Sequence, residues 1–257
     1  MESLRPLLRN KHKIILSCVL FNLVLEYWVH GILFFLNPAR IFLVLLYLAY
    51  FMMLEDLVLR FQLKDYQVWL FAVTFWVFYD AFVSGTIFGT GTFLGIDLFT
   101  FVMINLVWWG IIQAVLTMYF ANRFIAARDW TDPRMGRLGW ILAISYYVLM
   151  FPGGTLFDPN QPKGTFLGNI TSAIIVLAGI VSFYVSFRIK SEESPDETLE
   201  KHKILDILVI ITIALSLILG TFMFGSQTAQ QLSVYWSMVI CIVFIVYRII
   251  IRKCVPV

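Results

Sequence analysis

The sequence of 257 residues is short of charge, since Asp, Glu, Lys and Arg together make up only 14% of it. In a soluble domain about a quarter of all residues are charged, so this shortage excludes a water-soluble globular protein. Apolar residues make up 60% of the chain and the mean hydropathy is +0.85, which excludes intrinsic disorder. The composition therefore predicts a polytopic membrane protein.

Cysteine and histidine are also scarce, with three residues of each. No CxxC pair occurs, which argues against a thiol-redox or zinc motif, and Cys18 and Cys241 lie inside apolar runs, which argues against a disulfide framework. His30 is the only histidine in a predicted span, so a histidine-rich di-metal site is excluded. A single metal ion held by Glu26, His30 and Asp80 is a minor alternative, and we expect no bound metal. No motif identifies a cofactor.

Eight apolar runs are long enough to cross a bilayer, for which about 20 residues are needed. They cover about residues 14–36, 39–60, 67–88, 97–122, 138–157, 165–189, 204–224 and 232–251. Turn-forming and charged segments separate these runs, and no water-soluble domain is evident. We therefore predict one transmembrane domain over residues 1–257, an all-α bundle of eight membrane-spanning helices.

The basic residues are distributed unequally between the two sides of this topology. Of the 19 Lys and Arg residues, 17 fall on the side that holds both termini, and only Arg40 and Lys163 fall on the other. Because cytoplasmic loops are enriched in Lys and Arg, both termini are predicted to be cytoplasmic, with the protein in the plasma (inner) membrane. The expected partners are the lipid bilayer, other membrane proteins and a lipid or small-molecule ligand. The net charge of +3 is the sum over this asymmetric distribution, which indicates a membrane topology, and nucleic acid is not an expected partner.

Ionisable residues inside spans are costly, and each is a candidate functional residue. The first span carries four polar side chains at four-residue intervals, which places them on one helix face. These are Cys18, Asn22, Glu26 and His30. The topology places Glu26 and His30 at the depth of two polar residues on later spans, so we predict one polar pocket in the outer half, open outward or to the outer leaflet. Its proton-, ion- or ligand-binding residues are Glu26, His30, Asp80 and Asn105, with Asp97 at its mouth.

Two irregular segments lie on the predicted outer side. The stretch 84–95 has four glycines and no charge, and is either partly re-entrant or a flexible turn. The sequence Pro152-Gly153-Gly154 is expected to break or kink the fifth span before its outer end.

Rows of small residues in the last three spans are predicted to be packing faces, since they let helix backbones approach closely. The three rows are Gly179, Ser182 and Ser186; Thr212, Ser216 and Gly220; and Ser233, Ser237 and Cys241. The C-terminal half is therefore interpreted as a scaffold.

A second polar cluster is predicted near the cytoplasmic boundary, and its members are Glu55, Asp56, Arg60 and Asp206. Pairing of Glu55 or Asp56 with Arg60 favours an interfacial ion network. The run Glu55-Asp56-Leu57-Val58-Leu59-Arg60 resembles the EExxxR motif of the CAAX-protease and bacteriocin-processing family, which also has eight spans. That resemblance implies a protease with two later histidines. Asp80 stands near the position of the first, and no histidine lies in any later predicted span.

The leading functional hypothesis is a small membrane transporter, or a subunit of a transport complex, that binds a proton, an ion or a small solute. Glu26 would carry the proton or ion, with His30 as its partner. Two alternatives stay open. One is a membrane-embedded enzyme acting on a lipid or prenyl-type substrate, with Glu26, His30 and Asp80 as acid/base groups or metal ligands. The other is a non-catalytic structural subunit of a larger membrane complex.

Overall fold

The computed structural model describes residues 9–88, 92–157, 164–188, 203–223 and 227–251, and these are almost entirely helical. Seven helices in this part of the chain are long and apolar enough to cross a membrane. They cover Asn10–His30, Ile41–Phe61, Asp65–Ser84, Thr100–Ile125, Phe166–Ser186, Lys203–Phe222 and Gln230–Tyr247. The all-helical prediction is confirmed, and the architecture is that of an integral, multi-pass membrane protein.

The remaining predicted span corresponds to α6 (Arg137–Phe157), whose described apolar part, Arg137–Leu149, is shorter than a full span. The sequence Pro152-Gly153-Gly154 does not end this helix, which continues to Phe157. Proline removes one backbone donor, but flanking turns can continue around it. The count of eight spans stays a prediction.

The first predicted span ends earlier than expected, at a glycine. Helix α1 (Asn10–His30) stops where Gly31 adopts a φ of 70°, and the short helices α2 (Ile32–Phe35) and η1 (Pro38–Arg40) lead into α3 (Ile41–Phe61). A positive φ is accessible to glycine at little cost, which explains the break. His30 therefore lies at the last turn of α1.

Two spans contain long stretches of π-helical hydrogen bonding. Helix α4 (Asp65–Tyr79) continues as η2 (Asp80–Ser84). The next span consists of η3 (Thr100–Leu116), α5 (Thr117–Phe120) and η4 (Ala121–Ile125). π-Helical turns are rare in proteins and frequently occur at functional sites.

The glycine-rich connection between these two spans contains a small β-hairpin. Strands β1 (Thr92–Phe93) and β2 (Ile96–Asp97) are antiparallel, and their turn residues Leu94 and Gly95 both have positive φ, of 51° and 82°. Two positive φ values are typical of the type I′ turn that matches the twist of a hairpin. Part of the predicted re-entrant or flexible segment is therefore a hairpin, and residues 89–91 lie outside the described residues.

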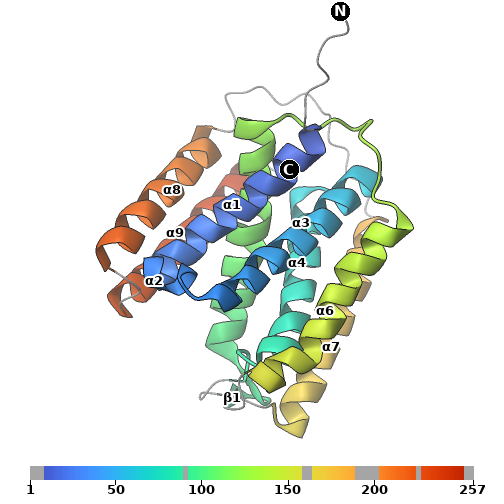
Figure 1. The fold of residues 1–257 in the computed structure, drawn as a ribbon, viewed down its shortest axis with the longest axis vertical. Helices are drawn as coiled ribbons and strands as arrows, with labels where there is room; N and C mark the ends of the chain where they lie inside the picture. Colours follow the sequence, from blue (N-terminus) through green and yellow to red (C-terminus); the bar gives the residue numbers. More distant parts are fainter. Residues whose placement is uncertain (1–8, 89–91, 158–163, 189–202, 224–226, 252–257) are drawn as a thin grey trace, which may run out of the picture.

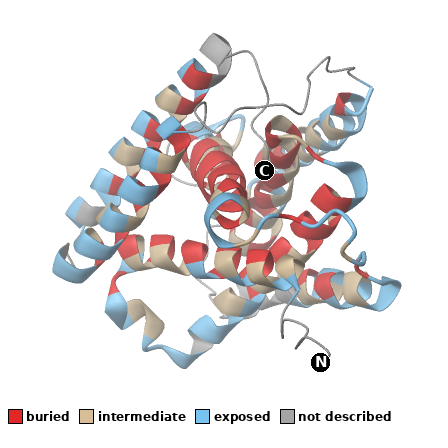
Figure 2. Ribbon diagram, turned by 90° about the horizontal axis from the view of Figure 1, so that it is seen from above, coloured by how far each residue is buried: buried red, intermediate tan, exposed pale blue. Residues whose placement is uncertain are grey.

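The bundle is arranged around η3. Figure 1 shows α1 crossing in front of it, α8 (Lys203–Met223) and α9 (Gln227–Ile251) on one side, and α3, α4, α6 and α7 (Phe166–Ser186) on the other. In the apolar stretch of the span that contains η3, 72% of the residues are buried, whereas in the apolar stretch of α7 only 11% are buried. Seen from above in Figure 2, buried residues gather at the centre and exposed ones face outward. Many of the exposed residues are large and apolar, as a lipid-facing surface requires.

Two of the predicted rows of small residues pack against neighbouring helices. Gly179 of α7 lies against Thr74 of α4, and Gly220 of α8 lies against the ring of Tyr27 of α1, so that a Cβ at either glycine would overlap its neighbour. The Thr221 hydroxyl also lies 2.9 Å from the Tyr27 hydroxyl. The row of Thr212, Ser216 and Gly220 is buried throughout and is a packing face, whereas in the other row Gly179 and Ser186 contact α4 and Ser182 is exposed.

The Gly179 contact predicts a stability effect. Gly179→Ala should lower the free energy of unfolding by about 1–3 kcal/mol, because the new methyl group overpacks the seam between α4 and α7. Thermal unfolding of the purified protein measures this effect. Gly136→Ala is the matched control, since nothing lies within 4 Å of a Cβ there. Adding Thr74→Ala should recover part of the loss. Equal melting temperatures for the two single variants would contradict the close approach.

Candidate functional site

Glu26 lies in a group of four hydrogen-bonding side chains from three helices. The Tyr47 hydroxyl of α3 donates to Glu26 Oε1, and Nε2 of Gln113 in η3 lies 3.3 Å from the same oxygen. On the other side, His30 Nε2 is 3.4 Å from Glu26 Oε2. The side chain of His30 is 38% exposed and that of Glu26 only 10%, so His30 is the accessible member of the pair.

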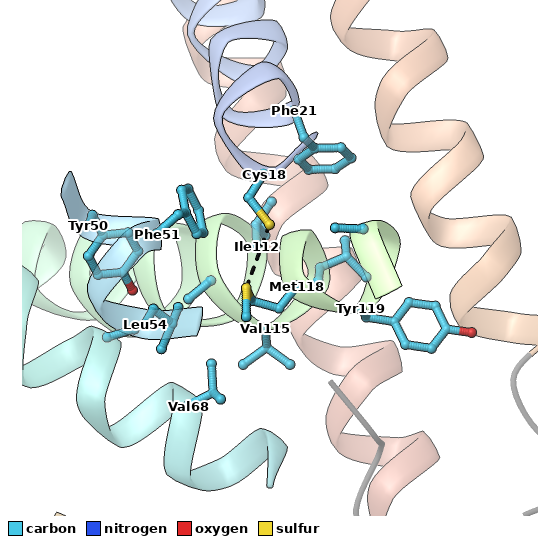
Figure 3. Packing of buried hydrophobic residues seen from close by; sticks show 14 of the residues in the cluster. Cys18, Phe21, Tyr50, Phe51, Leu54, Val68, Ile112, Val115, Met118 and Tyr119 are labelled. Atoms are coloured by element: carbon cyan, nitrogen blue, oxygen red, sulfur yellow. Dashed lines mark hydrogen bonds between the residues drawn. The ribbon is translucent and has the colours of Figure 1, made fainter. Parts of the chain in front are cut away.

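The polar stripe of α1 continues towards the interior through Asn22. Its amide nitrogen lies 3.0 Å from the carbonyl of Cys18 and 3.3 Å from both the Gln113 carbonyl and the Thr117 hydroxyl. Figure 3 shows Cys18 itself among apolar side chains, with its sulfur 3.6 Å from that of Met118. At Asn22 the stripe faces η3 and α5, and its first member, Cys18, belongs to the hydrophobic core.

Aromatic rings close the inner side of the Glu26 group. The Tyr47 ring centroid lies 6.3 Å from those of Trp76 and Trp109. The two tryptophans stack on each other at 3.8 Å. These rings and the burial of Tyr47 leave the His30 side as the open side of the carboxylate.

A pocket of about 400 Å³ lies on that open side, between α1, η3 and α9. It is lined by Glu26, Val29, His30, Met103, Ile104, Trp108, Trp109, Gln230, Ser233, Val234 and Ser237. The sequence interpretation missed α9, because Ser233 and Ser237 were assigned to a packing row. Gln230, three residues before Ser233, extends this polar face and was the signal available.

Asp80 and Asn105 form a separate group. Asp80 is 2% exposed and accepts a hydrogen bond of 3.0 Å from Ser84, while Asn105 is fully buried and lies close to the Asp80 carboxyl. No hydrogen bond or ion pair of the described residues joins this group to Glu26 or His30. Neither Asp80 nor Asn105 lines the pocket beside Glu26, and a single pocket that includes all of these residues stays a prediction.

Asp97 lies at the start of the fourth span, on β2. Its Oδ1 accepts a 3.0 Å hydrogen bond from the backbone N–H of Thr100, which caps the beginning of η3. This contact gives Asp97 a structural role, and its place at a pocket mouth stays a prediction.

Among residues 9–88, 92–157, 164–188, 203–223 and 227–251, no three His, Cys, Asp or Glu side chains are grouped as metal ligands.

The second predicted cluster has an additional member, Arg128. Its guanidinium makes a two-pronged contact with Glu55, at 2.9 and 2.7 Å, and both side chains are buried. Asp56 instead binds Arg60, at 2.5 Å. Of the two pairings considered for Arg60, the structure has the one with Asp56. Arg128 was missed because 73 residues separate it from Glu55.

The fourth member, Asp206, makes a different pair. Its carboxylate accepts hydrogen bonds from Arg123, at 3.2 and 3.3 Å, and from the Tyr119 hydroxyl, at 2.6 Å. These contacts join α8 to the end of the fourth span, apart from the bonds of Glu55 and Asp56.

The segment 126–136, which follows η4, closes this end of the bundle. Asp56 accepts hydrogen bonds from the Met135 backbone N–H, at 2.5 Å, and from Trp140 Nε1, at 2.8 Å. The start of α1 holds the same segment, because the backbone N–H of Lys11 donates to Asp132 at 3.0 Å. Within it, hydrogen bonds from the Thr131 hydroxyl and backbone N–H lower the pKa of Asp129. The cluster is therefore a structural clamp.

The buried pair of Glu55 and Arg128 predicts an unequal response to mutation. Arg128→Gln should destabilise the protein by about 3–5 kcal/mol, because it leaves a buried carboxylate without its partner. Arg123→Gln is the control and should cost at most about 1 kcal/mol, since its pair with Asp206 is partly exposed. Chemical unfolding followed by tryptophan fluorescence measures both. Similar losses in the two variants would contradict the burial argument.

Comparisons with known proteins give no relative from which a function can be transferred: no family model, no curated protein and no solved structure matches the chain. The resemblance to the CAAX-protease motif therefore rests on Glu55, Asp56 and Arg60 alone. All three are engaged in ion pairs within the clamp. The function has to be argued from the geometry beside Glu26.

Proposed function

We propose that this chain is a transporter, or a transport-complex subunit, whose pocket beside Glu26 binds a small cationic solute and exchanges it for protons. The observation that carries the proposal is the placement of Glu26. Its carboxylate is buried, is held by Tyr47 and Gln113, and faces a pocket of about 400 Å³ through His30. An ionisable group inside a membrane domain is costly, and such groups mark substrate or ion pathways in membrane proteins.

The lining of the pocket favours a cation. Glu26 and His30 are the only ionisable side chains among the residues that line it, so the pocket has one acid and no Lys or Arg. The rings of Trp108 and Trp109 add faces on which a cationic group is attracted by the ring electrons. Val29 and Ile104 accept the apolar part of such a solute. A compact amine satisfies all of these surfaces.

Proton exchange follows from the contact of Glu26 with His30. A proton shared between the two groups neutralises the carboxylate when the pocket holds no solute. A bound amine neutralises the same carboxylate, so the solute and the proton compete for one charge. This competition is the thermodynamic basis for exchange, because each occupant lowers the affinity for the other.

The same pocket is a poor fit for an enzyme of nucleophilic mechanism. Its two serine hydroxyls, Ser233 and Ser237, donate to the carbonyls of Gln230 and Ser233 on their own helix. Neither makes a hydrogen bond to His30 in the described part of the chain, and a nucleophile needs such a base within reach. Binding and exchange therefore explain the pocket better than hydrolysis.

Glu26→Gln should abolish amine-driven proton exchange. The purified protein is reconstituted in liposomes that contain a pH-sensitive dye, and a panel of small primary to quaternary amines is added. We expect at least one amine to drive a pH change with the wild type, and a rate at least tenfold lower with Glu26→Gln. Asp129→Asn is the control and should keep the rate, since Asp129 lies in the segment 126–136 and its carboxylate bonds only locally to Thr131 in the described residues. Full activity of Glu26→Gln, or no response of the wild type to any amine, would refute the proposal.

We also propose eight spans with both termini in the cytoplasm, in a plasma (inner) membrane. The distribution of Lys and Arg supports this orientation. The length of α6 supports the count, because 21 helical residues extend about 31 Å, close to the thickness of the hydrocarbon core.

Cysteine accessibility tests this topology. In a chain whose three native cysteines are replaced, Lys163→Cys should react with a membrane-impermeant maleimide on intact cells. Arg134→Cys should react only after permeabilisation, because α6 carries the chain from one side to the other. Labelling of both positions under the same condition would show that α6 does not cross the membrane.

A further inference from the structure

The Asp80 group contains buried polar atoms that have no hydrogen-bond partner among the described residues. These atoms are Asp80 Oδ2 and both polar atoms of the Asn105 side chain, although Asp80 is 2% exposed and Asn105 is fully buried. An unsatisfied buried donor or acceptor costs about 1–3 kcal/mol, and more when it is charged. Two of these atoms are oxygens, one of Asp80 and one of Asn105, and free oxygens in a buried place indicate that an additional ligand belongs there.

The electrostatic potential around the Asp80 carboxylate favours the binding of a positive charge. Asp80–Ser84 is the last turn of the α4–η2 helix, which ends where Gly85 adopts a φ of 67°. The C-terminal end of a helix is negative and destabilises a nearby carboxylate. No Lys, Arg or His of the described residues forms an ion pair with Asp80, so both negative contributions are uncompensated within that part of the chain.

The available donors are oxygens, and they come from two spans and the turn between them. The Ser84 hydroxyl is 3.0 Å from Asp80 Oδ1 and 2.9 Å from the Thr86 hydroxyl. Asn105, on η3, has its side-chain amide close to the Asp80 carboxyl, and the oxygen of that amide has no hydrogen-bond partner among the described residues. Oxygen-only sites prefer hard cations, and a site with a single carboxylate suits a monovalent ion rather than Ca²⁺, which takes six to eight oxygen ligands.

We propose that Asp80, Ser84, Thr86 and Asn105 bind one Na⁺ ion at the C-terminal end of the α4–η2 helix. Carbonyl-bearing helix ends coordinate Na⁺ in membrane transporters in the same way. The ion neutralises Asp80 and the helix end together, and it satisfies the free oxygens of Asp80 and Asn105. This site goes beyond the role proposed for Glu26, because no bond links the two groups within the described residues.

A thermal-shift titration tests the Na⁺ site without any knowledge of a transported solute. The purified protein is melted in NaCl, KCl or choline chloride at equal ionic strength, with CaCl₂ as a further arm. We expect 100 mM Na⁺ to raise the melting temperature of the wild type by about 3 °C or more over choline. Asp80→Asn should remove this shift in melting temperature. Ser84→Ala should increase, at least threefold, the Na⁺ concentration that gives half of the maximal shift.

The control is Glu26→Gln, which should keep the full Na⁺ shift even though it abolishes proton exchange. Ser84→Ala also covers the case in which Asp80→Asn does not fold. An equal melting temperature in Na⁺ and choline would overturn the site. So would a larger shift with Ca²⁺, a shift that persists in both variants, or stabilisation by low pH in place of Na⁺, which would identify Asp80 as a neutral carboxylic acid.

Discussion

A carboxylate inside an apolar bundle is costly unless other groups neutralise or solvate it, and the arrangement of this protein depends on how each buried acid meets that cost. Glu55 has a buried guanidinium against both of its oxygens, and Asp56 has Arg60, a backbone N–H and an indole N–H. Glu26 has only neutral donors and a partly exposed histidine. Asp80 accepts a hydrogen bond from Ser84 on one oxygen, and its other oxygen has no hydrogen-bond partner among the described residues. Glu55 and Asp56 therefore each have a cationic side chain as partner. Glu26 and Asp80, which lie further from that end of the bundle, have no Lys or Arg partner among the described residues.

This difference in ion pairing divides the bundle into an end that ion pairs hold in place and a part that can accept a ligand. The clamp of Glu55, Asp56 and Arg128 ties α3 to the segment 126–136, which also binds the start of α1. Such a network holds the helix ends while leaving the Glu26 pocket open between α1, η3 and α9. A protein that binds a solute inside the membrane needs both properties, because a site is selective only when its walls are held in place.

The sequence predicts contacts that arise from helical periodicity and misses those that arise from tertiary closure. Apolar run length located the helices, and four-residue spacing placed Asn22, Glu26 and His30 on one face. The pair of Glu55 with Arg128 joins residues 73 positions apart, and no local pattern encodes it. The break at Gly31 and the hairpin turn at Leu94 and Gly95 depend on positive φ values, which a glycine permits but does not by itself indicate. The sequence also leaves open whether Asp80 lies beside Glu26, because depth in a bilayer does not fix the position around the bundle axis.

The two proposed sites share one structural element, η3. It supplies Asn105 to the Asp80 group and Gln113 to the Glu26 group, and its Trp108 and Trp109 line the pocket between α1 and α9. A Na⁺ ion that binds Asn105 restrains the same helix whose tryptophans would contact the solute. If Na⁺ binding changes the affinity of the pocket, linkage requires the solute to change the affinity for Na⁺ by the same factor. The π-helical hydrogen bonding of η3 is relevant here, since a shift of one residue between i+4 and i+5 bonding rotates the side chains that follow. η3 is thus the element through which an ion at one site and a solute at the other would act on each other.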